Sequence, residues 1–363
     1  MKGYKALNMD MSSAYCDMVY KIGKKYTITG ELIICINGFH FCKHLEDVEN
    51  YYEIVKSRIF EVEAEGKIID GGNKSCAESI TLIRELSKEE IHQYFVDNQE
   101  RILEKYYPCQ KALADQGLCL DKLINNENWY VREAVAKQGY GLNILVNDKN
   151  YCVRAAVAKQ GYDLETLIHD KDPWVRVAVA KQGYGLDILV NDKNWRVREE
   201  AAAQGYSLDI LIKDEDPDVR KAVAVQGYGL NVLIEDESPT VRKEVARQGY
   251  GLETLIHDKD PWVRVAVAKQ DYGLDILVND KNWRVREEVA AQGYGLDILI
   301  KDESPTVRKE VARQGYGLNV LIEDESPTVR KEVARQGYGL ETLIHDLNGY
   351  VREVAYAKLE TLQ

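Results

Sequence analysis

A 22-residue periodicity of apolar and polar positions dominates the chain from about residue 108 onward. A valine followed by an arginine recurs from Arg132 to Arg352, and the spacing between successive arginines is always 22 residues. Repeats of this length are typical of supersecondary units that cannot bury their apolar face alone and must stack on neighbours. The periodicity therefore predicts a solenoid.

Each unit carries the signals of two short helices, as the copy that starts at Asp172 shows. Asn, Asp or Ser occupies this position in all eleven copies, and such side chains accept hydrogen bonds from the first turn of a helix. Gly183 suits the left-handed residue that ends a helix, and one copy carries Asp271 there. We expect a longer helix over 173–182 and a shorter α or 3₁₀ segment over 185–191.

The repeat unit resembles the leucine-rich repeat variant family and, more distantly, HEAT repeats, whose Asp…Val-Arg motif matches Asp170 to Arg176. The resemblance covers residues 108–363. The fold expected there is an all-α right-handed solenoid of about eleven 22-residue two-helix repeats with degenerate end caps. Because these units are shorter than those of either family, the resemblance does not extend to the superhelical pitch.

The invariant columns of the repeat have structural explanations. We expect the repeated arginine and the aspartate six residues before it, such as Asp192, to contribute to an ion-pair ladder. The tyrosine after the helix-ending glycine, such as Tyr184, is expected to pack back on the helix as part of a Schellman cap. A column repeated in every unit is not the singular constellation that catalysis needs.

Residues 1–87 show a different pattern and predict a small α+β domain. A helix is expected over 45–55, and a Ser-x-x-Glu capping box at Ser87 starts a connecting helix over 88–107 that Pro108 ends. Strands are expected where β-branched and aromatic residues cluster, at 26–29, 32–36 and 59–62.

Several N-terminal runs resemble an uncharacterised domain common in bacteriophage and prophage proteins: GFHFC at 38–42, YY at 51–52 and FEVE at 60–63. They more distantly resemble the centre of ADP-ribosyltransferases and RNA 2′-phosphotransferases. Those enzymes need an Arg or His on their first strand, and the first stretch, GYKA, contains neither. The resemblances imply a phage or mobile-element protein, with an ADP-ribosyltransferase-like enzyme that uses the solenoid for targeting as an alternative. His40 and Tyr51 are candidate binding residues here.

Charge narrows the class of partner. The chain has 48 basic and 60 acidic residues, and neither the N-terminal part nor the repeats are basic. Proteins that bind the phosphates of DNA or RNA usually carry more basic than acidic residues. The charge therefore disfavours a further alternative, in which the solenoid binds nucleic acid. No stretch reaches the ~18 apolar residues of a membrane helix and no secretion signal follows Met1. We expect a protein of the bacterial host's cytoplasm.

The seven cysteines predict free thiols in a reducing compartment, because their number is odd and their spacing irregular. Metal or iron–sulfur ligation would favour a Cys-x-x-Cys pair, and none exists. Instead, six residues separate Cys35 from Cys42 and nine separate Cys109 from Cys119, while Cys16 and Cys76 stand alone. We expect no metal site and no cofactor.

The variable columns are where a partner would be selected. All the tryptophans lie at the starts of longer helices and are candidate anchors: Trp129, Trp174, Trp195, Trp262 and Trp283. A column of the short segment never contains Lys or Arg, and it includes Asp187, Asp209, Asp275 and Asp297. If the short segments line the concave face, this column would attract a basic protein surface. Packing between repeats and helix capping account for the same residues equally well.

The sequence thus predicts a non-catalytic protein-binding scaffold, encoded by a phage or mobile element, that engages a host protein through the concave face of its solenoid and inhibits it.

Overall fold

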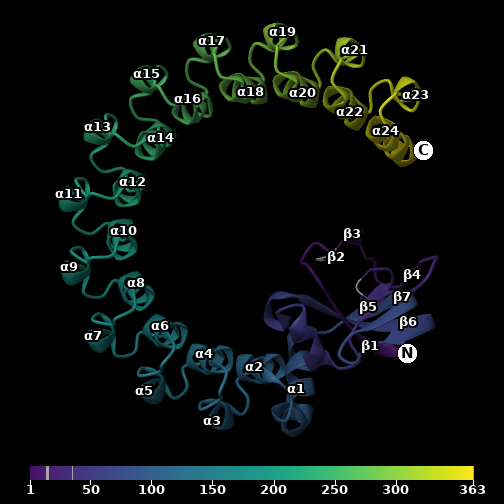
Figure 1. Ribbon diagram of the computed structural model, residues 1–363, viewed down its shortest axis with the longest axis vertical. Helices are drawn as coiled ribbons and strands as arrows, with labels where there is room; N and C mark the ends of the chain where they lie inside the picture. Colours follow the sequence, from purple (N-terminus) through teal and green to yellow (C-terminus); the bar gives the residue numbers. More distant parts are fainter. Residues whose placement is uncertain (14–15, 35, 363) are drawn as a thin grey trace. The chain divides into compact units, whose positions relative to one another are not determined.

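The computed structural model describes residues 1–13, 16–34 and 36–362, and the chain divides into two compact units, Met1–Gly185 and Leu186–Gln363. A small sheet domain and the first repeats form the first unit, and further repeats form the second (Figure 1). The fold class is the predicted one, an α+β region followed by a helical solenoid.

The N-terminal domain is built on an antiparallel five-stranded sheet in the order β1-β6-β7-β4, with β5 also paired to β7. Phe60, Val62 and Ala64 alternate along β6 and bury one face of the sheet. A separate hairpin pairs β2 (Ser12–Ser13) with β3 (Cys16–Val19). The sheet strands are β1 (Lys2–Leu7), β4 (Lys25–Thr27), β5 (Phe39–Phe41), β6 (Arg58–Asp70) and β7 (Ser75–Glu85).

Two predictions for this domain were wrong. The described part of 32–36 forms only an isolated bridge between Ile33 and Asn37, while Cys35 lies outside the described residues. The single helix predicted over 45–55 is two 3₁₀ helices, η1 (Leu45–Asn50) and η2 (Ile54–Lys56). Neither has a side-chain hydrogen bond at its N-cap, and short uncapped segments favour the tighter 3₁₀ turn.

The connecting helix α1 (Lys88–Leu103) begins at the predicted capping box. Ser87 Oγ accepts a hydrogen bond from the Glu90 N–H, and the Glu90 carboxylate accepts one from the Ser87 N–H. The connecting helix ends at Leu103 and not at the predicted residue 107, and Pro108 lies in the first turn of the next helix, α2 (Tyr107–Asp115), so this proline starts a helix instead of ending one. With α3 (Leu120–Leu123), α2 forms the degenerate first repeat.

The following repeats alternate a long and a short helix, as predicted. The long helices are α4 (Trp129–Lys137), α6 (Tyr151–Lys159), α8 (Pro173–Lys181), α10 (Trp195–Ala203), α12 (Pro217–Val225), α14 (Pro239–Arg247), α16 (Pro261–Ala268), α18 (Trp283–Ala291), α20 (Pro305–Arg313), α22 (Pro327–Arg335) and α24 (Gly349–Leu362). The short helices are α5 (Leu142–Leu145), α7 (Leu164–Leu167), α9 (Leu186–Leu189), α11 (Leu208–Leu211), α13 (Leu230–Leu233), α15 (Leu252–Leu255), α17 (Leu274–Leu277), α19 (Leu296–Leu299), α21 (Leu318–Leu321) and α23 (Leu340–Leu343).

Local capping explains why these helices begin and end where they do. At the start of α10, the Asn194 side chain accepts the Arg196 N–H. At its end, Gly205 adopts a φ of 75° and the Tyr206 N–H bonds to the Ala201 carbonyl at 3.1 Å, which is the predicted Schellman pattern. The prediction of side-chain capping was wrong at three positions, where the serine side chain makes no capping hydrogen bond: Ser238, Ser304 and Ser326.

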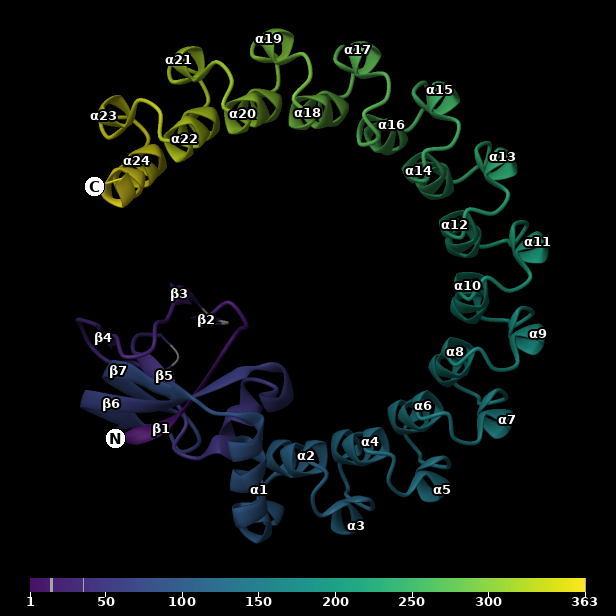
Figure 2. The ribbon, with the colours of Figure 1, turned by 180° about the vertical axis from the view of Figure 1, so that it is seen from behind.

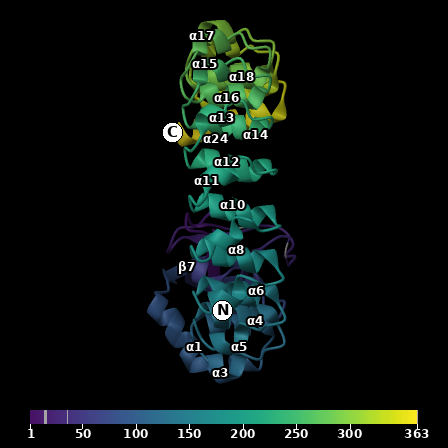
Figure 3. The ribbon, with the colours of Figure 1, turned by 90° about the vertical axis from the view of Figure 1, so that its left-hand side faces the viewer.

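Within residues 186–363, the long helices lie along the inside of the curve and the short helices along the outside (Figures 1 and 2). Successive long helices, such as α10, α12 and α14, stack on one another in the side view of Figure 3. Their valines and alanines form one continuous core. The expectation that the short segments line the concave face is therefore wrong.

Within each of the two units, buried ion pairs join successive repeats. The Arg220 guanidinium donates two hydrogen bonds to the Asp236 carboxylate, at 2.6 and 2.9 Å, and a third to the Asp214 carbonyl at 2.6 Å. The residue six positions before the arginine, an aspartate in most copies and Asn126 in the first, thus contributes its carbonyl, whereas the ion pair reaches forward to the next loop. The same pairing recurs in both units, for example between Arg132 and Asp148 and between Arg308 and Asp324. This is the predicted ladder, and it runs between repeats.

Candidate functional site

The predicted tryptophans differ in their exposure to solvent. Trp174 and Trp262 are about half exposed, at 50% and 52%, whereas Trp195 and Trp283 are half-buried and pack against the core of the second unit. Trp129 stacks on Tyr130, with ring centroids 3.7 Å apart. Trp174 and Trp262 are therefore the most accessible apolar anchors, while the other three also serve packing.

Arg284 brings two of the tryptophans together in the second unit. Its guanidinium carbon lies 4.4 Å from the ring centroid of Trp283 and 5.4 Å from that of Trp262, one repeat earlier. The three side chains come from the first turns of α16 and α18, where Trp262 and Arg284 are exposed and Trp283 is half-buried against the core. Cation–π contacts of this kind hold a guanidinium flat on a ring and make one continuous surface. We call Trp262, Trp283 and Arg284 the anchor cluster.

Carboxylates one turn further along α18 lie beside the anchor cluster. Burial raises the pKa of Glu287, and the negative charge of Glu310 on α20 raises it further. The positive charges of Lys309 and, to a smaller extent, Arg284 oppose this increase. The pKa of Glu287 is therefore raised first by removal of the carboxylate from water and only second by the nearby negative charge. A cation brought close to Glu287 would offset the repulsion from Glu310.

In the second unit, the acidic column predicted on the short helices lies along the outside of the curve, whereas the long helices that carry the anchor cluster lie along the inside (Figure 1). Asp209, Asp275 and Asp297 are exposed on α11, α17 and α19, which follow the outside of the curve in the second unit. Asp187, on α9, is exposed as well. Exposed apolar residues accompany the column, including Ile276 at 51%. Because these short helices follow the outside of the curve in the second unit (Figure 1), the column does not form the acidic concave groove that we expected.

The N-terminal domain contains a pocket of about 570 Å³, and its wall includes both predicted residues of this domain, His40 and Tyr51. His40 is the central residue of β5, between the buried Phe39 and Phe41. Pairing of Tyr4 with Cys42 brings β1 alongside, so that the Lys5 ammonium donates a hydrogen bond to the His40 carbonyl at 3.0 Å.

Lysines that sequence reasoning missed control the charge of this pocket. Lys5 is only 8% exposed, and its ammonium lies 5.1 Å from the ring centroid of Tyr20. The Lys74 ammonium lies 4.3 Å from the ring centroid of Tyr51. For Lys5, the signal in the sequence was a charged residue within the run that forms strand β1, at a position where an apolar residue is usual.

Two titratable groups of the pocket wall, His40 and Cys42, are held in their neutral forms. Burial, together with the charges of Lys74 and Lys5, lowers the pKa of His40 to about 4. Burial and the charge of Asp47 raise the pKa of Cys42 to about 12. The thiol and the imidazole therefore do not form the thiolate–imidazolium pair of a cysteine nucleophile at neutral pH. This arrangement supports binding more than catalysis.

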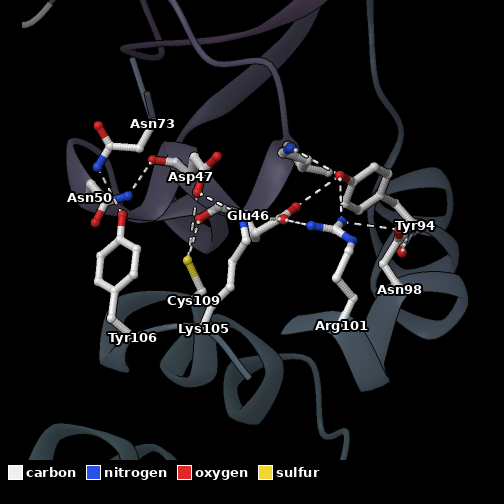
Figure 4. A network of polar contacts seen from close by, with 11 residues as sticks. Glu46, Asp47, Asn50, Asn73, Tyr94, Asn98, Arg101, Lys105, Tyr106 and Cys109 are labelled. Atoms are coloured by element: carbon white, nitrogen blue, oxygen red, sulfur yellow. Dashed lines mark hydrogen bonds and ion pairs between the residues drawn. The ribbon is translucent and has the colours of Figure 1, made fainter. Parts of the chain in front are cut away.

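A polar network connects the sheet domain to the first helices of the solenoid (Figure 4). The fully buried Glu46 accepts hydrogen bonds from Arg101 at 2.5 Å and from the Tyr94 hydroxyl at 2.8 Å, and its carboxylate pairs with Lys105 at 2.9 Å. Burial opposes ionisation of Glu46, but these partners outweigh it and lower its pKa to about 2. Lys105 also pairs with the buried Asp47. The network fixes η1 against α1.

The described cysteines Cys42, Cys76, Cys109, Cys119 and Cys152 are free thiols, as predicted. The Cys35 residue and the Cys16 side chain lie outside the described residues. Within the part of the chain that the structure describes, no three His, Cys, Asp or Glu side chains are grouped to hold a metal ion. None of the described helices combines the length and the apolar composition that crossing a bilayer requires.

Comparison with known proteins gives little about function. Residues 1–94 match a family described only as a domain of unknown function, DUF7666. No curated protein matches the chain. Among solved structures, a chain from microtubule polymerases with tumor overexpressed gene domain arrays is 12% identical, with 76% of this chain and 85% of that chain covered and a TM-score of 0.22. A computationally designed armadillo repeat protein for modular peptide recognition is 15% identical, with 76% and 94% covered and a TM-score of 0.10.

Proposed function

We propose that the chain is a protein-binding scaffold whose partner docks on the inner surface formed by the long helices. The observation that carries this proposal is the anchor cluster, in which a half-exposed tryptophan, a second tryptophan and an arginine form one surface. Tryptophan and arginine are the residue types most enriched in binding hot spots. A solenoid presents such a cluster on a long rigid surface, which suits a macromolecular partner.

The proposed partner presents an apolar or aromatic side chain to Trp262 and a basic side chain to Glu287. The raised pKa of Glu287 supports the second contact, because an added cation would offset the repulsion from Glu310. The proposed partner thus still has a basic surface, as we expected from the sequence. Glu287, and not the aspartates of the short helices, is the residue proposed to attract it. A phage origin and inhibition of a host protein form a finer proposal, which rests on the N-terminal resemblance alone.

Replacing Trp262 by alanine should accelerate dissociation of a partner co-purified with the full chain by about 30-fold, because truncating a hot-spot residue costs ~2 kcal/mol. Glu287→Gln should slow association and reduce its salt dependence. Both are measurable by biolayer interferometry with immobilised full-length protein.

Ile276→Ala is the matched control, because this side chain is as exposed as Trp262 but lies on the outer helix α17. It should leave both rates unchanged. Conversion of Asp187, Asp209, Asp275 and Asp297 to lysine tests the outer acidic column. If those changes abolish binding and Trp262→Ala does not, the partner binds the outer surface and the proposal is wrong.

A further inference from the structure

The pocket of the N-terminal domain has a charge opposite to that of the whole chain. Lys5 and Lys74 both reach its wall, and the described residues that line it include no aspartate or glutamate. The chain overall carries 60 acidic and 48 basic residues, so such a wall is not what its composition would produce by chance. Asp47, whose charge reaches Cys42 on the wall, is paired with Lys105, so the two ammonium groups around this partly apolar concavity favour anions there.

The two lysines act on the same place in the pocket. Lys5 and Lys74 line the pocket together with His40, and the charges of both lower the pKa of His40. Lys5 is held by the His40 carbonyl, and Lys74 is held over the ring of Tyr51. Their positions are therefore set before any ligand arrives, which reduces the entropy lost on binding. Neutral His40 adds a hydrogen-bonding group without adding charge.

The rest of the wall fits a flat apolar group. Tyr20, Phe39, Phe41, Tyr51 and Tyr52 all contribute to it. Aromatic side chains pack favourably on planar rings in offset or edge-to-face arrangements. The volume of about 570 Å³ is within the range of small-molecule sites and much larger than an inorganic ion needs.

We propose that this pocket binds a small organic anion in which a phosphate or carboxylate is joined to a planar ring. The anionic group lies between Lys5 and Lys74, and the ring packs on the tyrosines. Nothing in this inference depends on the solenoid or on the function proposed for it. A phosphate and a carboxylate would both bind the two lysines through their negative charge, and the two probes described below distinguish between them.

Isothermal titration of the full-length protein tests the proposal with adenosine monophosphate and indole-3-acetate as probes. Adenosine and inorganic phosphate are the matched compounds that lack the charge or the ring. We expect at least one of the ring anions to bind, and to bind about tenfold or more tightly than adenosine and phosphate, because a charge-assisted contact contributes more than ~1.4 kcal/mol. Which ring anion binds identifies the anionic group.

Lys74→Gln should weaken that binding by about tenfold, since it removes one of the two charges and leaves the half-buried side chain similar in size. Lys149→Gln, at an exposed loop position in the same unit, is the control and should have no effect. Because Lys5 is buried and its replacement could unfold the domain, Lys74 is the decisive position. The proposal is overturned if neither ring anion binds at millimolar concentration, if adenosine binds equally well, or if a folded Lys74→Gln variant keeps full affinity.

Discussion

Arg220→Ala should destabilise the solenoid by about 3–5 kcal/mol, because it leaves the buried Asp236 carboxylate without its cation. Arg220 is 7% exposed and donates to the carboxylate of the next repeat and to the Asp214 carbonyl of its own loop. After the substitution, the backbone N–H of Ser238 still donates to Asp236. That single bond does not replace a bidentate guanidinium.

The adjacent Lys221 provides the control. Its side chain is 39% exposed and meets Asp218 at 3.4 Å, so Lys221→Ala should change stability by no more than about 0.5 kcal/mol. Because solenoids can unfold in parts, amide hydrogen exchange on α12 and α14 should be measured together with the thermal midpoint. Equal stability of the two variants would show that the ladder does not hold the repeats together.

Glu46→Gln should have the second large effect, a loss of about 3 kcal/mol, because the buried carboxylate bonds to Arg101, Lys105 and Tyr94. The effect should depend on pH. The pKa of Glu46 is lowered to about 2 in the folded protein, whereas an unfolded glutamate titrates near ~4.3. Its contribution is therefore fully present above about pH 4.3 and is lost as the pH falls toward 2.

The measurement is the difference in free energy of unfolding between the wild type and Glu46→Gln at several pH values from 7 to 2.5. This difference should shrink steadily below about pH 4.3. Glu63→Gln, on an exposed position of β6, should show no such trend. A pH-independent difference for Glu46→Gln would mean that the carboxylate is not ionised in the network.

The repeats could be predicted closely because their local signals agree with one another. Asn194 caps the start of α10 and Gly205 ends it, so both ends of the helix are determined by nearby residues. The side on which each layer lies could not be predicted. Long helices contact one another directly, whereas short helices contact mainly the long ones, and the more closely packed layer takes the inside of the curve. That outcome depends on packing between units, which no single repeat shows.

The N-terminal site was predicted only in part, because its residues are distant in the sequence. His40 and Tyr51 were identified from the runs in which they occur. Lys74 was missed because pairing of β5 with β7 is what brings it to the pocket. The buried Glu46 was missed for a similar reason, since its partners come from α1, more than forty residues later.

Site-specific photo-crosslinking most directly tests the claim that the inner surface binds a protein. A photoreactive amino acid would replace Arg247 or Lys269, exposed on the long-helix layer, and in separate variants Ile276 or Ile298, exposed on the short-helix layer. In cells that produce the full chain, the two long-helix positions should form adducts with the same protein, and Trp262→Ala should reduce their yield. Adducts formed only from Ile276 and Ile298 would contradict the account.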